Sequence, residues 1–385
     1  MQGVSRPRVL IVGAFPPPDK MIFGGIVTSC KILLDSSFSE RFDLVLIDST
    51  QISNPPPGFF MRLAFAGRRT ARFVWLLRRS RPDCVLLFTA IGSSLVEKGM
   101  MAWLARLVGV PALMFPRGGQ LIDQARNTIS RVWIRWAFGG ARKVLCQGPA
   151  WQRFAVDTLG FSADDAPIIS NWTASVRLLA IGRGRSICPV GQPVRLLFLG
   201  WLEREKGIFE LLEACTRLVP AHAFTLAIVG RGHAESAARE FVAARGLSDR
   251  VRFLGWVQGQ DQENILKESD VLVLPSWVEG LPNAMIEAMA AGLAVVVSAV
   301  GNVPDVITDG VEALLVSPKD VSGLERVMTR VILDAELRLA LVERGHRFAA
   351  ENFAVETAVT KFDKVIQSVI RRPFGKYSQR RDFRG

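Results

Sequence analysis

The stretch 271-VLVLPSWVEGLPNAMIEAMA-290 decides the fold of this chain. It opens on four apolar residues, Val271 to Leu274. A short continuous apolar run is typical of a strand that is buried on both faces in a parallel sheet. Pro282 suits the beginning of a helix, since a missing N–H costs nothing in the first helical turn. The stretch therefore predicts a strand, a loop and a helix, which is the repeating unit of a parallel α/β sheet.

Apolar runs of strand length recur on both sides of this stretch. The first half of the chain opens on Arg8 to Gly13 and the second half on Val194 to Gly200, and both runs end in glycine. Further strands are predicted at 44–47, 84–88, 112–115 and 143–146, and at 225–229, 251–253, 294–298 and 313–316. Helical segments separate most of them. We therefore predict an α/β protein with two Rossmann-like, doubly wound domains that face each other across a cleft.

The length of 385 residues is enough for two domains. We expect an N-terminal domain over residues 1–173, a linker rich in glycine and arginine over 174–193, and a C-terminal domain over 194–350. A C-terminal helix over 351–372 is expected to pack back on the N-terminal domain, and a basic tail follows over 373–385.

The net charge of +12 is unevenly distributed along the chain. The positive excess lies in residues 1–170 and 371–385, whereas residues 171–370 are slightly acidic. Two stretches, 59–81 and 126–143, interleave arginines with aromatic residues, which suits an anionic membrane surface. The alternative is two ordinary amphipathic helices with solvated arginines. Nucleic acid is not expected as a partner, because no recognised RNA- or DNA-binding module occurs.

No stretch reaches the roughly 18 uncharged apolar residues that a spanning helix needs. The first 15 residues are interpreted as a strand rather than a signal peptide, because they lack a cleavage signal. The five cysteines are odd in number and widely spaced, which indicates free thiols. We expect a cytoplasmic protein, peripheral at the inner face of the plasma membrane.

The predicted helix that begins near Pro282 offers an anion site. The unpaired N–H groups of its first turn and the dipole behind them attract negative charge, and a diphosphate fits there. Glu279 precedes this helix and Glu287 lies about a turn into it, so both can face one cleft. Carboxylates accept hydrogen bonds from sugar and ribose hydroxyls. For an isolated pair of glutamates, a solvated loop residue and a surface helix residue would be the default interpretation.

The segment 279-EGLPNAMIEAMAAGLAVVVSAVGNVPDVITDGVEALLV-316 resembles the signature of retaining glycosyltransferases of the GT-B fold, particularly family 4. The hallmark of that family is a pair of glutamates separated by seven residues. The stretch LGWLEREKG (199–207) is similar to the family's loop after the first strand of the donor domain, and IVGRGHAES (228–236) to its nucleotide-side glycine loop. The resemblance spans about residues 196–318 and is weaker in the first half.

This resemblance implies a role for each matching residue. Glu287 would hold the ribose hydroxyls, Glu279 would contact the donor sugar near the reacting carbon, and Lys206 would neutralise the diphosphate. The family usually has an arginine where this chain has Trp201, and Arg204 is the candidate substitute. The full set of expected donor-binding residues is Glu287, Gly280, Leu281, Asn283, Gly24, Gly25, Arg204 and Gly230.

Arg117 is grouped with Glu279 and Lys206 as a candidate catalytic residue. Family members often have a histidine in this region, but the three histidines of this chain all lie in its second half. An arginine stays charged, so Arg117 suits an anionic acceptor or a donor phosphate better than proton abstraction.

We expect a hexosyltransferase-type enzyme that moves a sugar from a nucleotide-diphosphate sugar to a lipid-linked or polysaccharide acceptor in cell-surface glycan synthesis, with retention of configuration. No cofactor is expected beside this co-substrate. No metal is expected either, because the chain has no Asp-x-Asp pair and no metal-ligand spacing. A nucleotide-sugar epimerase of the same fold and a non-catalytic sugar-nucleotide-binding subunit are the alternatives. The incomplete G-x-G-x-x-G pattern, with Glu235 in third place, argues against a nicotinamide dehydrogenase.

Overall fold

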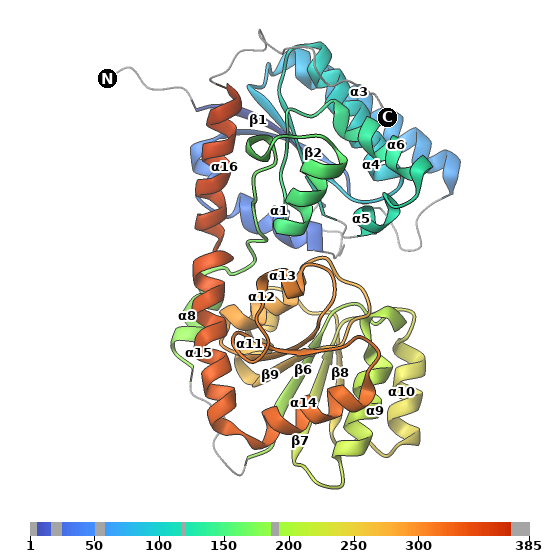
Figure 1. Cartoon of the computed structure of the whole chain (residues 1–385), viewed down its shortest axis with the longest axis vertical. Coiled ribbons are helices and arrows are strands. Elements are labelled where there is room, and N and C mark those ends of the chain that lie inside the picture. The colour runs from blue at the N-terminus through green and yellow to red at the C-terminus, as the bar shows by residue number, and fades with distance from the viewer. Residues whose placement is uncertain (1–5, 17–24, 51–57, 118–119, 186–191, 371–385) are drawn as a thin grey trace. The chain divides into compact units, whose positions relative to one another are not determined.

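The computed structural model describes residues 6–16, 25–50, 58–117, 120–185 and 192–370 (Figure 1). The chain divides into two compact units. Unit 1 consists of Met1–Trp172 and Val355–Gly385, and unit 2 of Thr173–Ala354. The predicted Gly24 and the basic tail 373–385 lie outside the described residues.

Unit 1 is built on a five-stranded parallel sheet in the order β2-β1-β3-β4-β5. Alternate residues of its strands point to opposite faces, so two separate cores form. Helices α1, α2 and α16 cover one face, and α3, α4 and α6 cover the other. The strands are β1 (Arg8–Gly13), β2 (Asp43–Asp48), β3 (Cys84–Thr89), β4 (Ala112–Pro116) and β5 (Lys143–Val144).

The helices of unit 1 include the last helix of the described chain. Phe362 of α16 is fully buried, with ring centroids of Phe38, Phe115 and Trp172 5.2–6.1 Å away. The helices are α1 (Gly25–Leu34), α2 (Phe38–Arg41), α3 (Phe59–Arg79), α4 (Ser93–Leu107), α5 (Gln120–Gln124), α6 (Thr128–Gly139), α7 (Pro149–Arg153) and α16 (Val355–Ile370), with a π-helical turn at Phe154–Thr158 and a 3-10 turn at Ala163–Asp165.

Unit 2 contains a six-stranded parallel sheet in the order β11-β10-β9-β6-β7-β8. Its first strand, β6, pairs with β7 on one side and with β9 on the other, so the order reverses between β6 and β9. In open α/β sheets such a switch point is where ligands bind, at the carboxyl ends of the strands. The strands are β6 (Val194–Leu199), β7 (Phe224–Val229), β8 (Val251–Gly255), β9 (Val271–Leu274), β10 (Ala294–Ser298) and β11 (Leu314–Val316).

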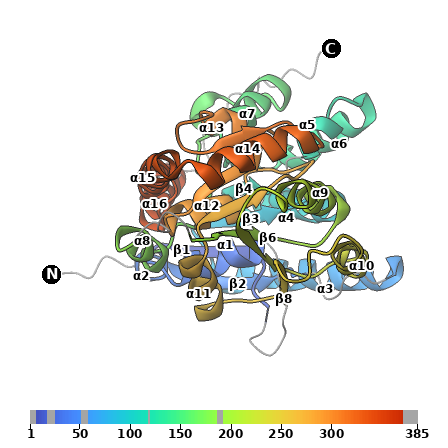
Figure 2. The same ribbon diagram turned by 90° about the horizontal axis from the view of Figure 1, so that it is seen from below.

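Helices α9 and α14 pack side by side in unit 2 (Figures 1 and 2). Helix α8 lies within the expected linker; Ser175 caps its start, and Leu178 is buried in the core that includes α12 and α15. The helices are α8 (Val176–Arg183), α9 (Ile208–Leu218), α10 (Glu235–Ala244), α11 (Gln260–Glu268), α12 (Asn283–Ala290), α13 (Val303–Val306), α14 (Val321–Leu333) and α15 (Ala335–Asn352), with a 3-10 turn at Arg204–Lys206.

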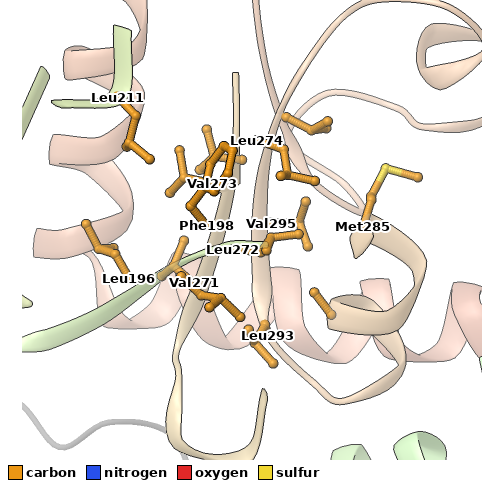
Figure 3. Packing of buried hydrophobic residues seen from close by; sticks show 14 of the residues in the cluster. Leu196, Phe198, Leu211, Val271, Leu272, Val273, Leu274, Met285, Leu293 and Val295 are labelled. Carbon is orange, nitrogen blue, oxygen red and sulfur yellow. The ribbon is translucent and has the colours of Figure 1, made fainter. Parts of the chain in front are cut away.

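The switch point of unit 2 lies in its hydrophobic core. All four residues of β9 are buried, and Figure 3 shows them among Phe198 of β6, Val295 of β10 and Met285 of α12. Strands held in this way give the loops at their ends a rigid base. Among the residues that the structure describes, no helix combines the length and the hydrophobicity that crossing a bilayer requires.

Candidate functional site

The loops that follow β6 and β9 meet at the switch point of unit 2. The backbone N–H of Trp277 donates to the carbonyl oxygen of Glu205 at 2.7 Å, which joins the two loops. Gly207 has a φ of +73°, and a Cβ atom there would collide with the carbonyl of Pro275. Glycine is therefore required at 207, because the loop after β9 passes directly over it.

Lys206 and Glu279 form an ion pair between these loops. The Lys206 Nζ lies 2.7 Å from the Glu279 Oε1, and the buried hydroxyl of Ser276 donates to the same oxygen at 2.8 Å. The two charged side chains are only 25% and 14% exposed. Glu279 is thus not the solvated loop residue of the default interpretation. The site presents a cation and a carboxylate in fixed positions.

The turn at Glu279 and Gly280 is fixed by the loop after β10. The Asn302 N–H donates to the Gly280 carbonyl at 2.8 Å, and Gly301 lies so close that a Cβ there would collide with the Glu279 carbonyl. Leu281, next in the chain, is buried in the core of unit 2. The expected donor-binding residues at 280 and 281 therefore also serve to hold Glu279 in place.

Helix α12 begins at Asn283, one residue after Pro282. Its N-cap residue, Pro282, makes no side-chain capping hydrogen bond, and no acidic residue lies in its first turn. The Asn283 carbonyl accepts a hydrogen bond from the Thr173 hydroxyl at 3.4 Å. By contrast, helix α10, which follows the glycine loop, has Glu235 in its first turn. Of these two helix starts, the one at α12 is the better suited to an anion.

Glu287 is buried in α12, where its side chain meets one partner from another helix. The Gln262 Nε2 on α11 donates to the Glu287 Oε2 at 2.7 Å, and Glu287 is 6% exposed. Burial raises the pKa of the Glu287 carboxyl to about 8, although the hydrogen bond from Gln262 opposes this. Gln262 was missed from the sequence, because nothing in the polar helix α11 singles it out.

Gly230 and Arg204, two of the expected donor-binding residues, contact parts of unit 2 other than the Lys206–Glu279 pair and Glu287. The Gly230 N–H donates to the Gly255 carbonyl at 2.8 Å, and a Cβ at 230 would collide with the Gly200 carbonyl. Gly230 therefore allows three strand ends to pack closely. Arg204 is exposed, and its guanidinium lies over the ring of Phe209, 5.8 Å from the centroid.

Arg117 follows β4 in unit 1, and Gly25 is the first residue of α1 in the same unit. The Arg117 Nη2 donates to the Ser29 hydroxyl at 2.8 Å. Its guanidinium lies over the rings of Phe115 and Trp172, 5.2 and 5.1 Å from their centroids. Burial lowers the pKa of Arg117 to about 10, and its Nη1 has no hydrogen-bond partner within the described ranges. Arg117 is thus a largely buried cation that forms no ion pair with a carboxylate of the described residues.

Comparison with known proteins gives two family matches. The family described as "Glycosyl transferases group 1" matches residues 189–348, and the one described as "Glycosyl transferase 4-like domain" matches residues 38–172. The chain is 30% identical over 230 residues to the lipopolysaccharide core biosynthesis glycosyltransferase LpsE of Rhizobium meliloti (strain 1021). That alignment covers 60% of this chain and 64% of LpsE, which is less than two thirds of the relative.

Two solved structures superimpose on nearly the whole chain. Sucrose-phosphate synthase from Thermosynechococcus elongatus has a TM-score of 0.75 at 18% identity, covering 95% of this chain and all of the other. Anabaena HepE in complex with UDP and glucose has a TM-score of 0.70 at 18% identity, covering 94% of this chain and all of HepE. At such identities the likeness establishes the fold.

The buried carboxyl of Glu287 should make folding stability depend on pH. The pKa of the Glu287 carboxyl is about 8 in the folded protein and 4.5 in the unfolded chain. Its contribution to the free energy of unfolding is therefore complete below about pH 4.5 and is lost as the pH rises through 8. Glu287→Gln cannot ionise. We expect wild type to lose roughly 1–4 kcal/mol of unfolding free energy relative to this variant between about pH 5 and pH 8, measured by urea denaturation.

The exposed Glu268 on α11 supplies the matched control. Glu268→Gln should follow the wild-type pH dependence throughout. If the wild-type and Glu287→Gln curves run parallel over this range, the Glu287 carboxyl does not have the raised pKa.

Proposed function

We propose that this chain, which belongs to the glycosyl transferases of group 1 and has the GT-B fold, moves a hexose from a nucleotide-diphosphate sugar to an acceptor. The observation that carries this proposal is the Lys206–Glu279 pair at the switch point of unit 2. The proposal includes retention of anomeric configuration, which the likeness of 279–316 to retaining enzymes supports.

The donor diphosphate would lie between Lys206 and the start of α12. Breaking the bond between sugar and phosphate leaves negative charge on the diphosphate, and a fixed ammonium with oriented N–H groups stabilises that charge where it develops. Before the donor binds, Glu279 balances the charge of Lys206. The complex of HepE with UDP and glucose supports a nucleotide as the donor's carrier.

Glu287 would bind the ribose hydroxyls. A carboxyl that is neutral over part of the physiological pH range can both donate and accept hydrogen bonds, which suits a pair of hydroxyl groups. Glu279 would contact the transferred sugar: within the described ranges both Lys206 and Ser276 donate to its Oε1, which leaves Oε2 for a sugar hydroxyl.

The acceptor would be an anionic, lipid-linked or polysaccharide intermediate in cell-surface glycan synthesis. The likeness to LpsE, named for lipopolysaccharide core biosynthesis, supports a glycan pathway. Arg117 supports an anionic group on one of the two substrates, because a buried guanidinium without a carboxylate is stabilised by an anion.

An anionic membrane surface would be the partner of unit 1. Helices α3 and α6 contain no acidic residue. Phe60, Trp75 and Trp133 on these helices are 84%, 59% and 59% exposed, whereas Phe73 and Phe138 are buried in the core. Exposed aromatic rings beside arginines favour a lipid interface over an ordinary solvated face. We propose a peripheral position at the inner face of the plasma membrane.

Transfer is proposed to need no metal ion. No three His, Cys, Asp or Glu side chains in the described parts of the chain are arranged to hold one. Lys206 and the start of α12 would supply the positive charge instead. We expect turnover to persist in excess chelator, measured by product formation from a labelled donor. Loss of turnover that Mg²⁺ or Mn²⁺ restores would show this to be wrong.

Substitutions at Lys206, Glu279 and Glu287 should separate nucleotide binding from sugar transfer. We expect Lys206→Ala to lower turnover about 10²- to 10³-fold, because it removes the cation that faces the leaving group. Glu279→Ala should also act mainly on turnover. Glu287→Ala should weaken nucleotide binding about tenfold, since it removes the carboxyl that would bind the ribose hydroxyls, at about 1 kcal/mol for a hydrogen bond. Binding is measured by thermal protection and turnover by kinetics with the nucleotide sugar that protects best.

Exposed neighbours on α11 provide the controls for these variants. Lys267→Ala and Glu268→Ala remove the same side-chain types outside the site and should leave both measurements at wild-type values. Wild-type kinetics and binding in the Lys206, Glu279 and Glu287 variants would remove these residues from the proposed site.

Membrane binding should depend on arginines of α3. Changing Arg72, Arg78 and Arg79 to Gln should weaken binding to anionic vesicles about 100-fold, at about 1 kcal/mol for each charge near the surface. The measurement is flotation with phosphatidylglycerol-containing and with purely neutral vesicles.

The matched control changes three exposed arginines of unit 2, Arg330, Arg344 and Arg347, to Gln. This control has the same net charge as the α3 variant and should bind like wild type. Equal binding of wild type to neutral and anionic vesicles, or an equal loss in both triple variants, would contradict a membrane surface on unit 1.

A further inference from the structure

Two tryptophans meet at the carboxyl edge of the second sheet. Trp201 follows β6 and Trp256 follows β8, and their ring centroids are 4.9 Å apart at an interplanar angle of 45°. Strand β7 lies between β6 and β8, which places these two strands about 10 Å apart. The two indoles therefore lean toward each other across the end of β7.

The backbone beneath this tryptophan pair is tightly fixed. Strand β7 is followed by Gly230, whose N–H donates to the Gly255 carbonyl and where a Cβ would collide with the Gly200 carbonyl. The Leu202 N–H donates to the Arg231 carbonyl at 2.9 Å, which ties the loop after β6 to the loop after β7. Both indoles remain partly exposed above this base. The two rings are tilted by 45° to each other, so each presents its own face, and a partly exposed indole face on a rigid base is suited to stacking.

The tryptophan pair is linked to both ends of the proposed donor site. The loop after β6 begins with Trp201 and ends with Lys206, which faces Glu279. The connection from β8 to α11 begins with Trp256 and leads to Gln262, whose amide holds Glu287. One tryptophan is thus joined to the group proposed for the diphosphate, and the other to the group proposed for the ribose.

We propose that Trp201 and Trp256 form a stacking platform for the nucleobase of the donor. This inference rests on the proposed function, which requires a nucleoside diphosphate in unit 2. A base stacked on an aromatic side chain is stabilised whatever its identity, because every base has a π face. The platform would thus distinguish a nucleotide from inorganic diphosphate. Trp201, in the place where an arginine was expected, contributes affinity for the base instead of charge for the phosphates.

The test compares nucleotides with inorganic diphosphate in calorimetric titrations. UDP, GDP and ADP are titrated into wild type, and the tightest of them into Trp201→Ala and Trp201→Phe. Trp201→Ala should weaken nucleotide binding about 5- to 100-fold and leave the affinity for inorganic diphosphate within about twofold of wild type. Trp201→Phe, which keeps an aromatic face, should retain most of the nucleotide affinity.

Fluorescence gives a signature that a merely structural pair would not produce. Nucleotide binding should quench the tryptophan emission of wild type, and Trp201→Phe should lose much of that quenching. The control is Trp103→Phe, which removes a tryptophan of α4 in unit 1 and should leave nucleotide affinity at the wild-type value.

Three other outcomes of these experiments would contradict the proposed platform. A lower melting temperature of Trp201→Ala with unchanged nucleotide affinity would show that the pair only packs, and would overturn the platform. An equal loss for nucleotide and inorganic diphosphate would overturn it as well, because the substitution would then act through the loop that bears Lys206. If no nucleotide binds wild type, the proposed function fails, and the platform fails with it.

Discussion

The pairing of β6 with β9 is the constraint on which the rest of unit 2 depends. These strands are first and fourth in the unit, yet they are neighbours in the sheet, so the loops after them leave the same edge side by side. That adjacency brings Lys206 within 2.7 Å of Glu279, which is 73 residues further along the chain. Buried apolar side chains fix both strands, and the collision that any larger residue would cause at 207 fixes the spacing of the loops. A site built in this way needs little rearrangement to hold its charges in place.

Helix α12 packs into the core of unit 2 and also contains Glu287 of the candidate site. Its residues from Met285 to Ala290 are buried, and Glu287 is the single acidic residue among them. An ionised carboxylate is unfavourable in the interior when a single amide, here that of Gln262, is its partner. The raised pKa of Glu287 reflects this free-energy cost of ionisation. Such a group is uncommon in a helix that only packs. Its position favours a ligand whose hydroxyl groups can replace the water that the carboxyl has lost, and perturbed carboxyl groups of this kind are concentrated at functional sites.

Much of this arrangement could be predicted from the sequence, because its signals are local. Every predicted strand appears in the structure, since continuous apolar runs bounded by turn residues are specific for buried parallel strands. The apolar run 271–274 and the proline before α12 indicated the strand, loop and helix that hold Glu279 and Glu287. Contacts between distant residues could not be predicted in this way. Gln262 beside Glu287, the indole of Trp256 against Trp201, and the aromatic rings around Arg117 each depend on tertiary packing. Helix α8 was missed because glycine and arginine obscure its one short apolar face.

Unit 1 differs from unit 2 in having a row of exposed arginines on α3. In unit 2 the charges of the site are paired or hydrogen-bonded, as in Lys206 with Glu279 and Glu287 with Gln262. Arg69 of unit 1 is likewise paired with Glu97 of α4, which ties α3 to the core. The arginines on the outward side of α3 are exposed, beside aromatic rings that gain nothing from water. A surface of this composition suits a partner that offers both apolar contact and negative charge. An anionic bilayer would offer both, whereas a soluble glycan offers no apolar phase, and on this ground we propose an acceptor that is itself held in the membrane.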